Sequence, residues 1–360
     1  MSEAHIRRRR EVVLELKRRD LDCLLVTHPA NWFYLTGFTG EAGVLVVSKD
    51  GSTLITDGRF TAQAKEEAPG IHVELQKGTV VVSAGEWLKR RRMRRVGFDP
   101  GQWTVAQWKA WRKASGSVCR GIEAPGIVER LRTRKDAQEL AVMRKAAILA
   151  GEVLEGVLHL VRPGIRESEI AGEIEYQMKK RGASGPSFET IVASGKRAAL
   201  PHGRPTAKRL RKNELVVLDL GAILGNYCSD ITRTVHVGRA SRRIRTLYGA
   251  VQKAQEAAVA AVKAGVTCGD VDAAARDVLK KEGLDAYFVH STGHGLGLEV
   301  HEEPRVARGQ AIRLEPGNVI TIEPGVYVEG VGGIRIEDDV AVRFHGSEIL
   351  TRVRRDLIEL

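Results

Sequence analysis

A stretch of the sequence recurs in weakened form 101 residues later, and this repeat limits the folds open to the second part of the chain. A Val-x-x-Gly-[Ile/Val] pattern at 161–165 returns at 262–266. The match continues through one helix, with Glu169-Ile170 against Asp270-Val271, Lys180 against Lys281 and Gly182 against Gly283. We therefore predict a duplicated unit of two helices followed by strands, related by a pseudo-twofold axis. Chance similarity between helix ends that carry Gly and Lys is the alternative.

The amino-terminal third alternates helix and strand patterns. Residues 8–19 form an amphipathic helix pattern, and the apolar run 23–27 is typical of a strand. The runs 43–48 and 52–56 flank Asp50-Gly51, which predicts a hairpin with a type I′ turn. We assign residues 1–125 to an α/β domain. Residues 126–360, which begin with a helix pattern at 135–160, form the second domain.

Composition favours a folded protein of two domains that works in the cytoplasm. The chain has 360 residues, of which 43% are apolar and 28% charged. Its four cysteines are far apart without a C-x-x-C pair, and the basic amino terminus is not followed by an apolar run. No window approaches the roughly 20 apolar residues that a membrane span needs. We expect a reduced, cytoplasmic protein that does not enter a membrane.

The net charge of +12 raises the question of nucleic-acid binding. The basic residues are dispersed, and their short clusters lack the interleaved aromatic side chains on which bases stack. Solvated surfaces are the better interpretation, and no nucleic-acid partner is expected. Heat adaptation and a GC-rich genome both produce such arginine-rich surfaces, and the sequence does not distinguish between the two causes.

Two acids lie in a predicted hairpin. The strand patterns 215–221 and 227–235 flank Gly225-Asn226, and a two-residue turn there pairs residues whose numbers sum to 451. Asp219 then lies opposite Thr232, with Asp230 two residues along, so both carboxylates share one face. A carboxylate in an apolar strand costs several kcal/mol unless cations or donors compensate. One such acid fits a salt bridge to Arg233 or a lysine equally well, whereas two on one face favour metal.

Histidines and a second pair of acids follow. The segment 290–304 holds His290, His294 and His301 among glycines, and neutral imidazole is a good ligand for Mn, Co or Zn. Glu323 ends an apolar strand before Pro324, and two residues separate Arg335 from Glu337, so these two share a face. An exposed Arg335–Glu337 ion pair explains that segment alone but not the whole set.

Four carboxylates and one histidine together suit two divalent cations bridged by shared carboxylates. Such a pair lowers the pKa of a bridging water and polarises a carbonyl, as in dinuclear aminopeptidases.

The spacing from Asp219 to Asp230, the G-H-G-x-G-x-E-x-H-E-x-P run and the I-E-P-G then R-I-E-D order resemble the prolidase, aminopeptidase P and methionine aminopeptidase superfamily, and the match spans most of the chain. The resemblance implies an α+β protein with a pita-bread catalytic domain and a smaller α/β creatinase-like amino-terminal domain. It implies that the metal ligands are Asp219, Asp230, His294, Glu323 and Glu337, with Asp230 and Glu337 bridging.

The resemblance also implies the roles of other residues. Glu323 would accept a proton from the bridging water, since the hydroxide between the metals is the nucleophile. His202, His290 and His301 would steady the scissile carbonyl and its oxyanion. Tyr327 and Arg335 would hold and orient these groups around the scissile carbonyl.

The expected activity is hydrolysis of Xaa-Pro bonds by a prolidase (Xaa-Pro dipeptidase) or an aminopeptidase P. The expected cofactors are two divalent ions, Mn first and Co or Zn as alternatives, and relatives with this amino-terminal domain form homodimers. A methionine-type aminopeptidase usually lacks a domain such as 1–125, creatinase lacks the metal ligands, and non-catalytic relatives lose them. Dipeptidase or aminopeptidase preference, the physiological metal and the oligomeric state stay open.

Overall fold

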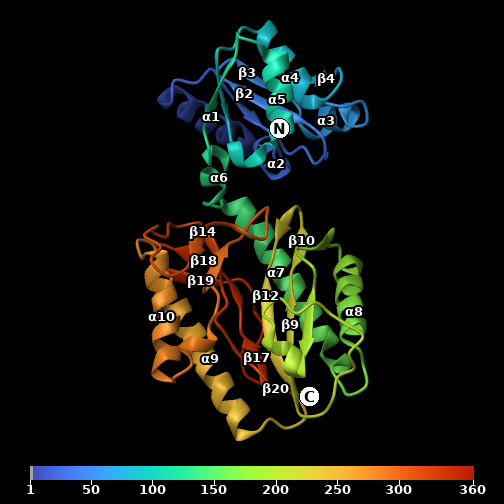
Figure 1. Ribbon diagram of the computed structural model, residues 1–360, viewed down its shortest axis with the longest axis vertical. Coiled ribbons are helices and arrows are strands. Elements are labelled where there is room, and N and C mark those ends of the chain that lie inside the picture. Colours follow the sequence, from blue (N-terminus) through green and yellow to red (C-terminus); the bar gives the residue numbers. More distant parts are fainter. Residues whose placement is uncertain (1–2) are drawn as a thin grey trace. The chain divides into compact units, whose positions relative to one another are not determined.

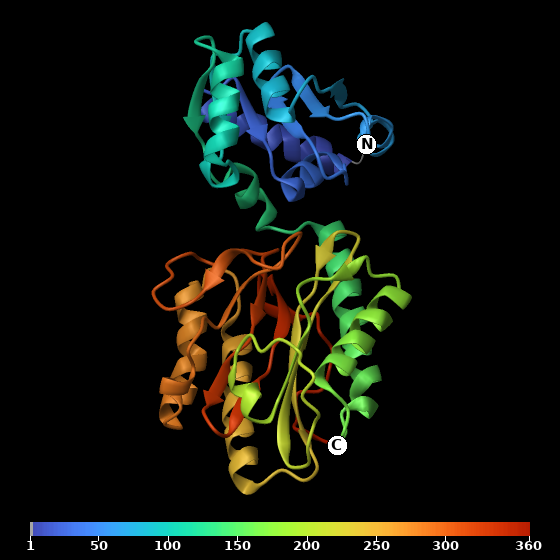
Figure 2. The ribbon, with the colours of Figure 1, turned by 45° about the vertical axis from the view of Figure 1, so that its right-hand side comes forward.

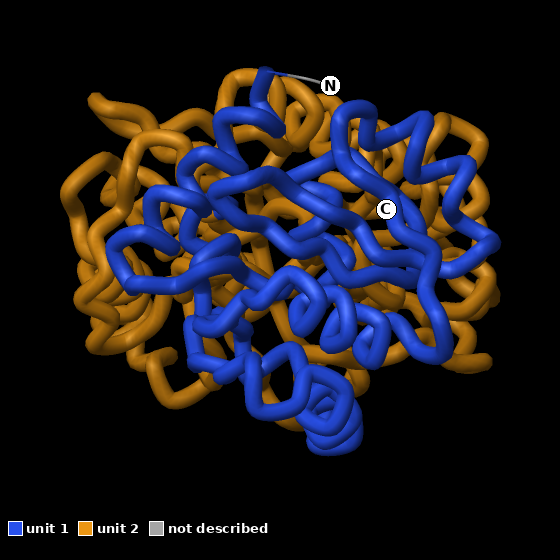
Figure 3. The backbone as a smooth tube through the Cα atoms, turned by 90° about the horizontal axis from the view of Figure 1, so that it is seen from above, with its two compact units in different colours: residues 1–132 blue, residues 133–360 orange. Residues whose placement is uncertain are grey.

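The computed structural model describes residues 3–360 and divides the chain into two compact units, 1–132 and 133–360 (Figure 3). The sequence places the boundary at residue 125, before helix α6 (Ile127–Arg132). The structure groups α6 with unit 1, where Ile127 and Val128 are buried and Arg132 donates a hydrogen bond to Asn31 at 2.7 Å.

Unit 1 is an α/β domain around one sheet of six strands in the order β4-β3-β2-β1-β5-β6 (Figure 1). The strands are β1 (Cys23–Val26), β2 (Val44–Ser48), β3 (Gly51–Thr56), β4 (His72–Leu75), β5 (Arg95–Phe98) and β6 (Arg120–Glu123). The helices besides α6 are α1 (Glu3–Arg18), α2 (Pro29–Thr36), α3 (Thr61–Glu67), α4 (Val80–Arg90) and α5 (Val105–Ser115), with a short η1 (Pro100–Gln102).

Apolar side chains of α4 and α5 pack on one face of this sheet. Trp87 and Leu88 of α4 and Trp111 of α5 belong to the same buried cluster as strand residues Leu25 and Val46. The burial of each such side chain stabilises the fold by about 1.5–3 kcal/mol. The predicted helix at 8–19 is α1, which begins earlier, and the predicted strand at 23–27 is β1.

The hairpin between β2 and β3 exists, but its predicted type I′ turn is wrong. Ser48 pairs with Gly51, so the two loop residues are Lys49 and Asp50 rather than Asp50 and Gly51. A type I′ turn needs positive φ at both central residues. Among the described residues of this hairpin only Gly51 has positive φ, at +129°, because glycine adopts it without steric cost.

Unit 2 contains two long helices, two shorter ones and several sheets. The helices are α7 (Ala137–Val157), α8 (Glu167–Lys180), α9 (Arg242–Ala261) and α10 (Cys268–Lys281), with the short η2 (Leu158–Leu160), η3 (Gly195–Ala199) and η4 (Asp285–Tyr287). The strands of its first part are β7 (Gly185–Pro186), β8 (Ile191–Ser194), β9 (Glu214–Leu220), β10 (Ala222–Leu224), β11 (Tyr227–Cys228) and β12 (Ile231–Val237). Those of its second part are β13 (Gly293–Gly295), β14 (Glu302–Val306), β15 (Val319–Ile322), β16 (Gly325–Val328), β17 (Gly332–Arg335), β18 (Asp338–Arg343), β19 (Gly346–Ile349) and β20 (Ile358–Glu359).

The backbone of unit 2 shows the internal repeat directly. Helices α8 and α10 begin and end at residues 101 apart. Gly164 donates to the Leu210 carbonyl at 2.9 Å, and Gly265 donates to the Leu314 carbonyl at 2.8 Å. Both glycines have positive φ, +95° and +85°, so the same turn leads into each helix. The repeated segments therefore have the same local structure, as a duplication requires.

Each half of unit 2 packs its own helices against its own strands. Helices α7 and α8 lie along one side of the strands, and α9 and α10 along the other (Figures 1 and 2). The first buried cluster joins α7 and α8 to β9 and β12, and the second joins α9 and α10 to β15 and β18. The strands of both halves therefore meet in the middle of the unit.

The hairpin of β9 and β12 has the predicted register. Asp219 pairs with Thr232, and every residue pair of the two strands sums to 451. Gly225 and Asn226 both have positive φ, +54° and +67°, as a two-residue turn of type I′ requires. The sheet that contains these two strands has the order β20-β12-β9-β8, and a five-stranded sheet of the second half has the order β14-β13-β15-β18-β19.

Over residues 3–360, no helix combines the length and the apolar character needed to cross a bilayer.

Candidate metal centre

The residues predicted as metal ligands lie where the strands of the two halves meet. Asp219 is in β9, and Asp230 directly precedes β12. His294 is in β13, Glu323 follows β15, and Glu337 precedes β18. The first two come from one half of unit 2 and the other three from the second half.

Three of these side chains converge closely. Asp230, His294 and Glu337 each offer one ligand atom, and these atoms all lie within 4.8 Å of one another. His294 Nε2 is 3.3 Å from Glu323 Oε1 and 3.9 Å from Asp230 Oδ2. The structure therefore places a carboxylate of the first half beside an imidazole and two carboxylates of the second.

Asp219 joins this cluster through Arg335. Arg335 Nη2 donates to Asp219 Oδ2 at 2.5 Å, while its Nε donates to Thr232 Oγ1 at 3.0 Å. Thr232 in turn donates to Glu337 Oε2 at 2.6 Å. The salt bridge that the sequence left open for Asp219 thus forms with Arg335, whereas Arg233 pairs with a different acid, Asp338.

Several carboxylate oxygens in the cluster are buried without a hydrogen-bond partner among the described residues. They are Oδ1 of Asp219, Oδ1 of Asp230 and Oε1 of Glu337. An unpartnered buried polar atom costs about 1–3 kcal/mol, and more when it is charged. Cations bound to these oxygens would remove that cost, so the donor set of oxygens and one imidazole fits divalent metal ions.

The tautomer of His294 suits a metal ligand. Its Nδ1 donates to the Gly295 carbonyl at 3.0 Å, because a carbonyl can only accept. Nε2 is therefore the nitrogen that faces Glu323 and Asp230. A backbone carbonyl that fixes the second ring nitrogen is the usual arrangement around metal-binding histidines.

The acids of the cluster have opposite pKa shifts. Burial first, and then the neighbouring Glu337, raise the pKa of Asp230 well above its usual range. Burial followed by the charge of Glu323 does the same for Glu337. Burial would raise the pKa of Glu323 as well, but the hydrogen bond and charge of His294 outweigh it and lower that pKa to about 2. Glu323 and His294, 3.3 Å apart, therefore form an ion pair.

Arg335, Tyr327 and His290 form a chain of hydrogen bonds beside the cluster. Arg335 Nη1 donates to the Tyr327 hydroxyl at 2.7 Å, and that hydroxyl lies 2.9 Å from His290 Nε2. His290 Nδ1 donates to the Ser291 carbonyl at 2.8 Å, which leaves Nε2 as the acceptor for Tyr327. Burial lowers the pKa of His290, which favours this neutral form.

His202 and His301 are exposed side chains at the edge of the cluster. The His301 ring packs edge to face on His294, with centroids 4.3 Å apart. His202 follows Pro201, whose carbonyl accepts a hydrogen bond from Arg335 at 3.0 Å. The structure thus brings both histidines near the predicted ligands, on the side open to solvent.

An ion pair on helix α10 that the sequence does not mark as functional fixes the segment carrying His290. Arg276 donates from Nε to Asp272 Oδ2 at 2.7 Å and from Nη2 to the His290 carbonyl at 2.6 Å. Asp272 Oδ1 accepts from Thr292 Oγ1 at 2.8 Å, and the Thr292 carbonyl accepts from the Glu323 amide at 2.8 Å. The spacing of four between Asp272 and Arg276 is a helical pattern, but nothing in the sequence indicates their distant partners.

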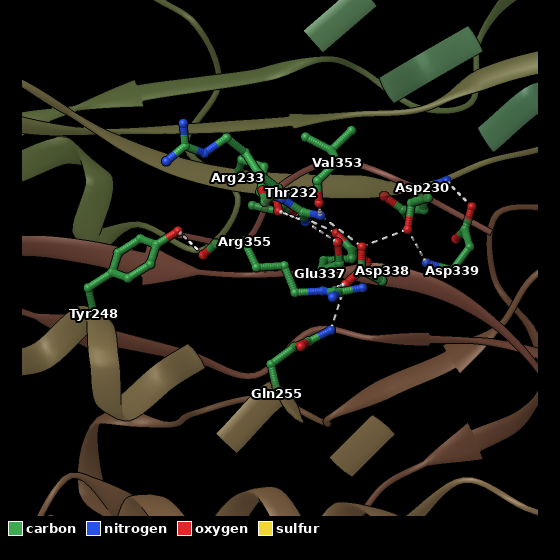
Figure 4. Close-up of polar contacts among 12 residues, drawn as sticks. Asp230, Thr232, Arg233, Tyr248, Gln255, Glu337, Asp338, Asp339, Val353 and Arg355 are labelled. Atoms are coloured by element: carbon green, nitrogen blue, oxygen red, sulfur yellow. Dashed lines mark hydrogen bonds and ion pairs between the residues drawn. The ribbon is translucent and has the colours of Figure 1, made fainter. Parts of the chain in front are cut away.

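A second missed group surrounds Asp338, behind Glu337 (Figure 4). Asp338 is fully buried and accepts from Arg233 Nη2 at 2.8 Å, Arg355 Nε at 2.5 Å and Gln255 Nε2 at 2.7 Å. Arg233 also donates from Nη1 to the Glu337 carbonyl at 2.6 Å. This network binds β12, β18 and the carboxyl-terminal segment together at the ligand cluster.

Comparison with known proteins follows the same division. Residues 141–343 match the model of metallopeptidase family M24, and residues 8–134 match the creatinase/prolidase N-terminal domain. The chain belongs to metallopeptidase family M24. A protein named Xaa-Pro dipeptidase from Pyrococcus furiosus is 36% identical over 97% of this M24 chain and 98% of its own length.

Solved structures agree with this assignment. The structure of the Xaa-Pro dipeptidase from Bacillus anthracis is 38% identical, covers 99% of this M24 chain and 100% of the other, and gives a TM-score of 0.96. The structure of the X-Pro aminopeptidase from Thermotoga maritima is 34% identical, covers 96% and 100%, and gives 0.89. This M24 chain is thus a peptidase with a creatinase-like amino-terminal domain and a pita-bread catalytic domain, and its family uses divalent metal ions.

Proposed function

We propose that this protein hydrolyses the bond between a residue and a following proline, with two divalent cations held by Asp219, Asp230, His294, Glu323 and Glu337. The observation that carries the proposal is the convergence of Asp230, His294 and Glu337 from both halves of unit 2. Relatives of nearly the same length, from Pyrococcus furiosus and Pyrococcus horikoshii, are named Xaa-Pro dipeptidase.

The unpartnered oxygens support the ligand assignment. One oxygen each of Asp219, Asp230 and Glu337 is buried without a donor, while the other oxygen of Asp219 and of Glu337 is held by Arg335 or Thr232. Each of these two side chains is thus oriented by one oxygen and offers the other to a cation. Asp230 and Glu337, at the centre of the cluster, are the proposed bridging ligands.

Cations in this centre would lower the pKa of a bound water to near neutrality and polarise the scissile carbonyl. Glu323 is the proposed proton acceptor from that water. Its carboxylate lies next to His294 and accepts from Thr321 Oγ1 at 3.2 Å, which fixes its orientation. The low pKa of Glu323 keeps its carboxylate ionised at neutral pH, which is the form that can accept a proton.

Two histidines are proposed to contact the substrate, and a third, His290, is proposed to act through Tyr327 because both of its ring nitrogens have partners. His202 and His301 are exposed beside the cluster and can donate hydrogen bonds to the developing oxyanion. His290 accepts from Tyr327 at Nε2, so it orients the Tyr327 hydroxyl while it is in this neutral form. Arg335 supports the arrangement by holding Tyr327 and Asp219 at the same time.

The proposed metal is Mn²⁺, with Co²⁺ or Zn²⁺ as alternatives, because carboxylates with one imidazole accept all three. We further propose that the protein works in the cytoplasm as a homodimer. The cytoplasmic location is supported by four buried free cysteines, which fit a reducing compartment. No nucleic-acid partner is proposed.

The test is hydrolysis of Xaa-Pro dipeptides and of Xaa-Pro-Xaa tripeptides by metal-free protein reloaded with Mn²⁺, Co²⁺ or Zn²⁺. Release of proline from the dipeptides supports a dipeptidase, and release of the first residue from the tripeptides supports an aminopeptidase. Ala-Ala is the control peptide. Cleavage of Ala-Ala without cleavage of any Xaa-Pro peptide would contradict the proposal.

A further inference from the structure

Asp339 lies beside the proposed ligands but belongs to none of the patterns that identified them. It is 1% exposed, and its Oδ2 accepts from the Asp230 amide at 3.1 Å. Its Oδ1 has no hydrogen-bond partner among the described residues. A buried carboxylate oxygen without a donor is costly, so its retention in a folded protein requires an explanation.

The direction of Asp339 follows from strand geometry. Side chains alternate along a strand, so Asp338 and Asp339, the first two residues of β18, face opposite sides. Figure 4 shows this division, with Asp338 among Arg233, Arg355 and Gln255, and Asp339 beside Asp230. The guanidinium groups of Arg233 and Arg355 are hydrogen-bonded to Asp338, and within residues 3–360 Asp339 forms no ion pair with a basic side chain.

We infer that Asp339 is a further acid of the metal centre, which supplies negative charge to the cations and positions Asp230 through its backbone amide. This inference rests on the proposed function. When divalent cations bind the centre, Oδ1 of Asp339 gains a partner, which is either a cation or a water molecule bound to a cation. Groups that support metal ligands in this way contribute about ten- to hundred-fold to metal affinity.

The test is the Mn²⁺ affinity of chelator-treated Asp339→Asn protein, measured by isothermal titration calorimetry. Asparagine keeps an oxygen for the Asp230 amide and has nearly the same shape, but it removes the charge. We expect Mn²⁺ affinity to fall about ten- to hundred-fold. The melting temperature of the metal-free variant should equal or exceed that of the wild type, since a buried charge is lost.

A matched control is Glu167→Gln. Glu167 is 0% exposed, but its oxygens accept from Ser194, Arg197 and Thr206, away from the cluster. We expect this variant to melt at a lower temperature and to bind Mn²⁺ as the wild type does. Asp339→Asn should therefore lose Mn²⁺ affinity without losing stability, and Glu167→Gln should lose stability without losing affinity.

Each outcome decides a separate question. If the wild type binds no Mn²⁺, Co²⁺ or Zn²⁺, the proposed function fails. If the wild type binds Mn²⁺ and Asp339→Asn binds it equally well, only the role of Asp339 is refuted. Should Asp339→Asn fail to fold, Asp339→Ala titrated with formate or with neutral formamide replaces it. Recovery of Mn²⁺ affinity with formate but not with formamide supports the role of the Asp339 charge. Equal effects of formate and formamide overturn that role, and so does failure of both Asp339→Asn and Asp339→Ala to fold.

Discussion

Arg335 holds Asp219 at 2.5 Å and the Tyr327 hydroxyl at 2.7 Å, so one guanidinium group joins a proposed ligand from the first half of unit 2 to a residue of the second. Its Nε also reaches Thr232, which orients Glu337. Lysine cannot reproduce this geometry, because its single ammonium group lacks the planar fork.

Arg335→Lys should therefore lower kcat by about ten- to hundred-fold, as expected for residues that orient metal ligands. The measurement is steady-state kinetics with an Xaa-Pro dipeptide at saturating Mn²⁺. Arg308→Lys, on an exposed side chain, is the control and should behave as the wild type. An unchanged kcat for Arg335→Lys would contradict the role assigned to Arg335.

Removal of metal should destabilise the protein. Binding of a ligand to the folded state alone stabilises it by about 2.7 kcal/mol when its concentration is 100 times Kd. A chelator should lower the melting temperature, and added Mn²⁺ should restore it. His294→Ala should melt at nearly the same temperature with and without Mn²⁺, because the imidazole is one of the three convergent groups proposed as ligands. A wild type that does not respond to the chelator would refute the metal centre.

The Thr292 hydroxyl should matter for catalysis although Thr292 is not itself a proposed ligand. Thr292→Val removes the hydrogen bond to Asp272 while keeping the shape, and Thr292→Ser keeps it. We expect Thr292→Val to lower kcat several-fold with little change in KM, and Thr292→Ser to retain most activity. The reason is that the Thr292 carbonyl accepts from the Glu323 amide. Equal kinetics of the two variants would exclude this coupling.

Glu348 should contribute a pH-dependent part of the stability. Its hydrogen bond with Arg144 lowers the pKa of Glu348 to about 2. A depressed carboxyl pKa stabilises the fold above the unfolded value of about 4.3, and that stability is lost as pH falls toward 2. Because the pair is partly exposed, the effect should be about 0.5–1 kcal/mol.

Urea unfolding of the wild type and of Glu348→Gln at pH 6, 4.5 and 3 measures this contribution. The difference between the two proteins should be largest at pH 6 and shrink at pH 3. A difference that is constant with pH would show that Glu348 acts through packing alone.

The sequence predicts the parts of the site that depend on local geometry. The turn at Gly225-Asn226 fixes the pairing of Asp219 with Thr232, because a two-residue loop allows one register. The offset of 101 residues predicts the matching helices α8 and α10, since the turn before each helix has a glycine with positive φ at the equivalent position, Gly164 or Gly265. Three of the five proposed ligands converge, as the resemblance implies.

The sequence does not indicate hydrogen-bond partners that are far apart along the chain. Asp272 and Arg276 appear as an ordinary helical ion pair, and only the fold places Thr292 and the His290 carbonyl against them. Asp338 and Asp339 read as two adjacent acids, and only the strand orientation separates the one that meets arginines from the one that does not. The predicted type I′ turn at Asp50-Gly51 is wrong for a local reason, because only the glycine of the two residues has positive φ.

The five proposed ligands contain one nitrogen donor, on His294. Only one of two neighbouring cations can bind that imidazole, so the paired positions are chemically unequal. Loading should then proceed in two steps of different affinity, and a softer ion such as Zn²⁺ should prefer the position with nitrogen. Mixed-metal forms, with a different ion in each position, are a natural product of this asymmetry.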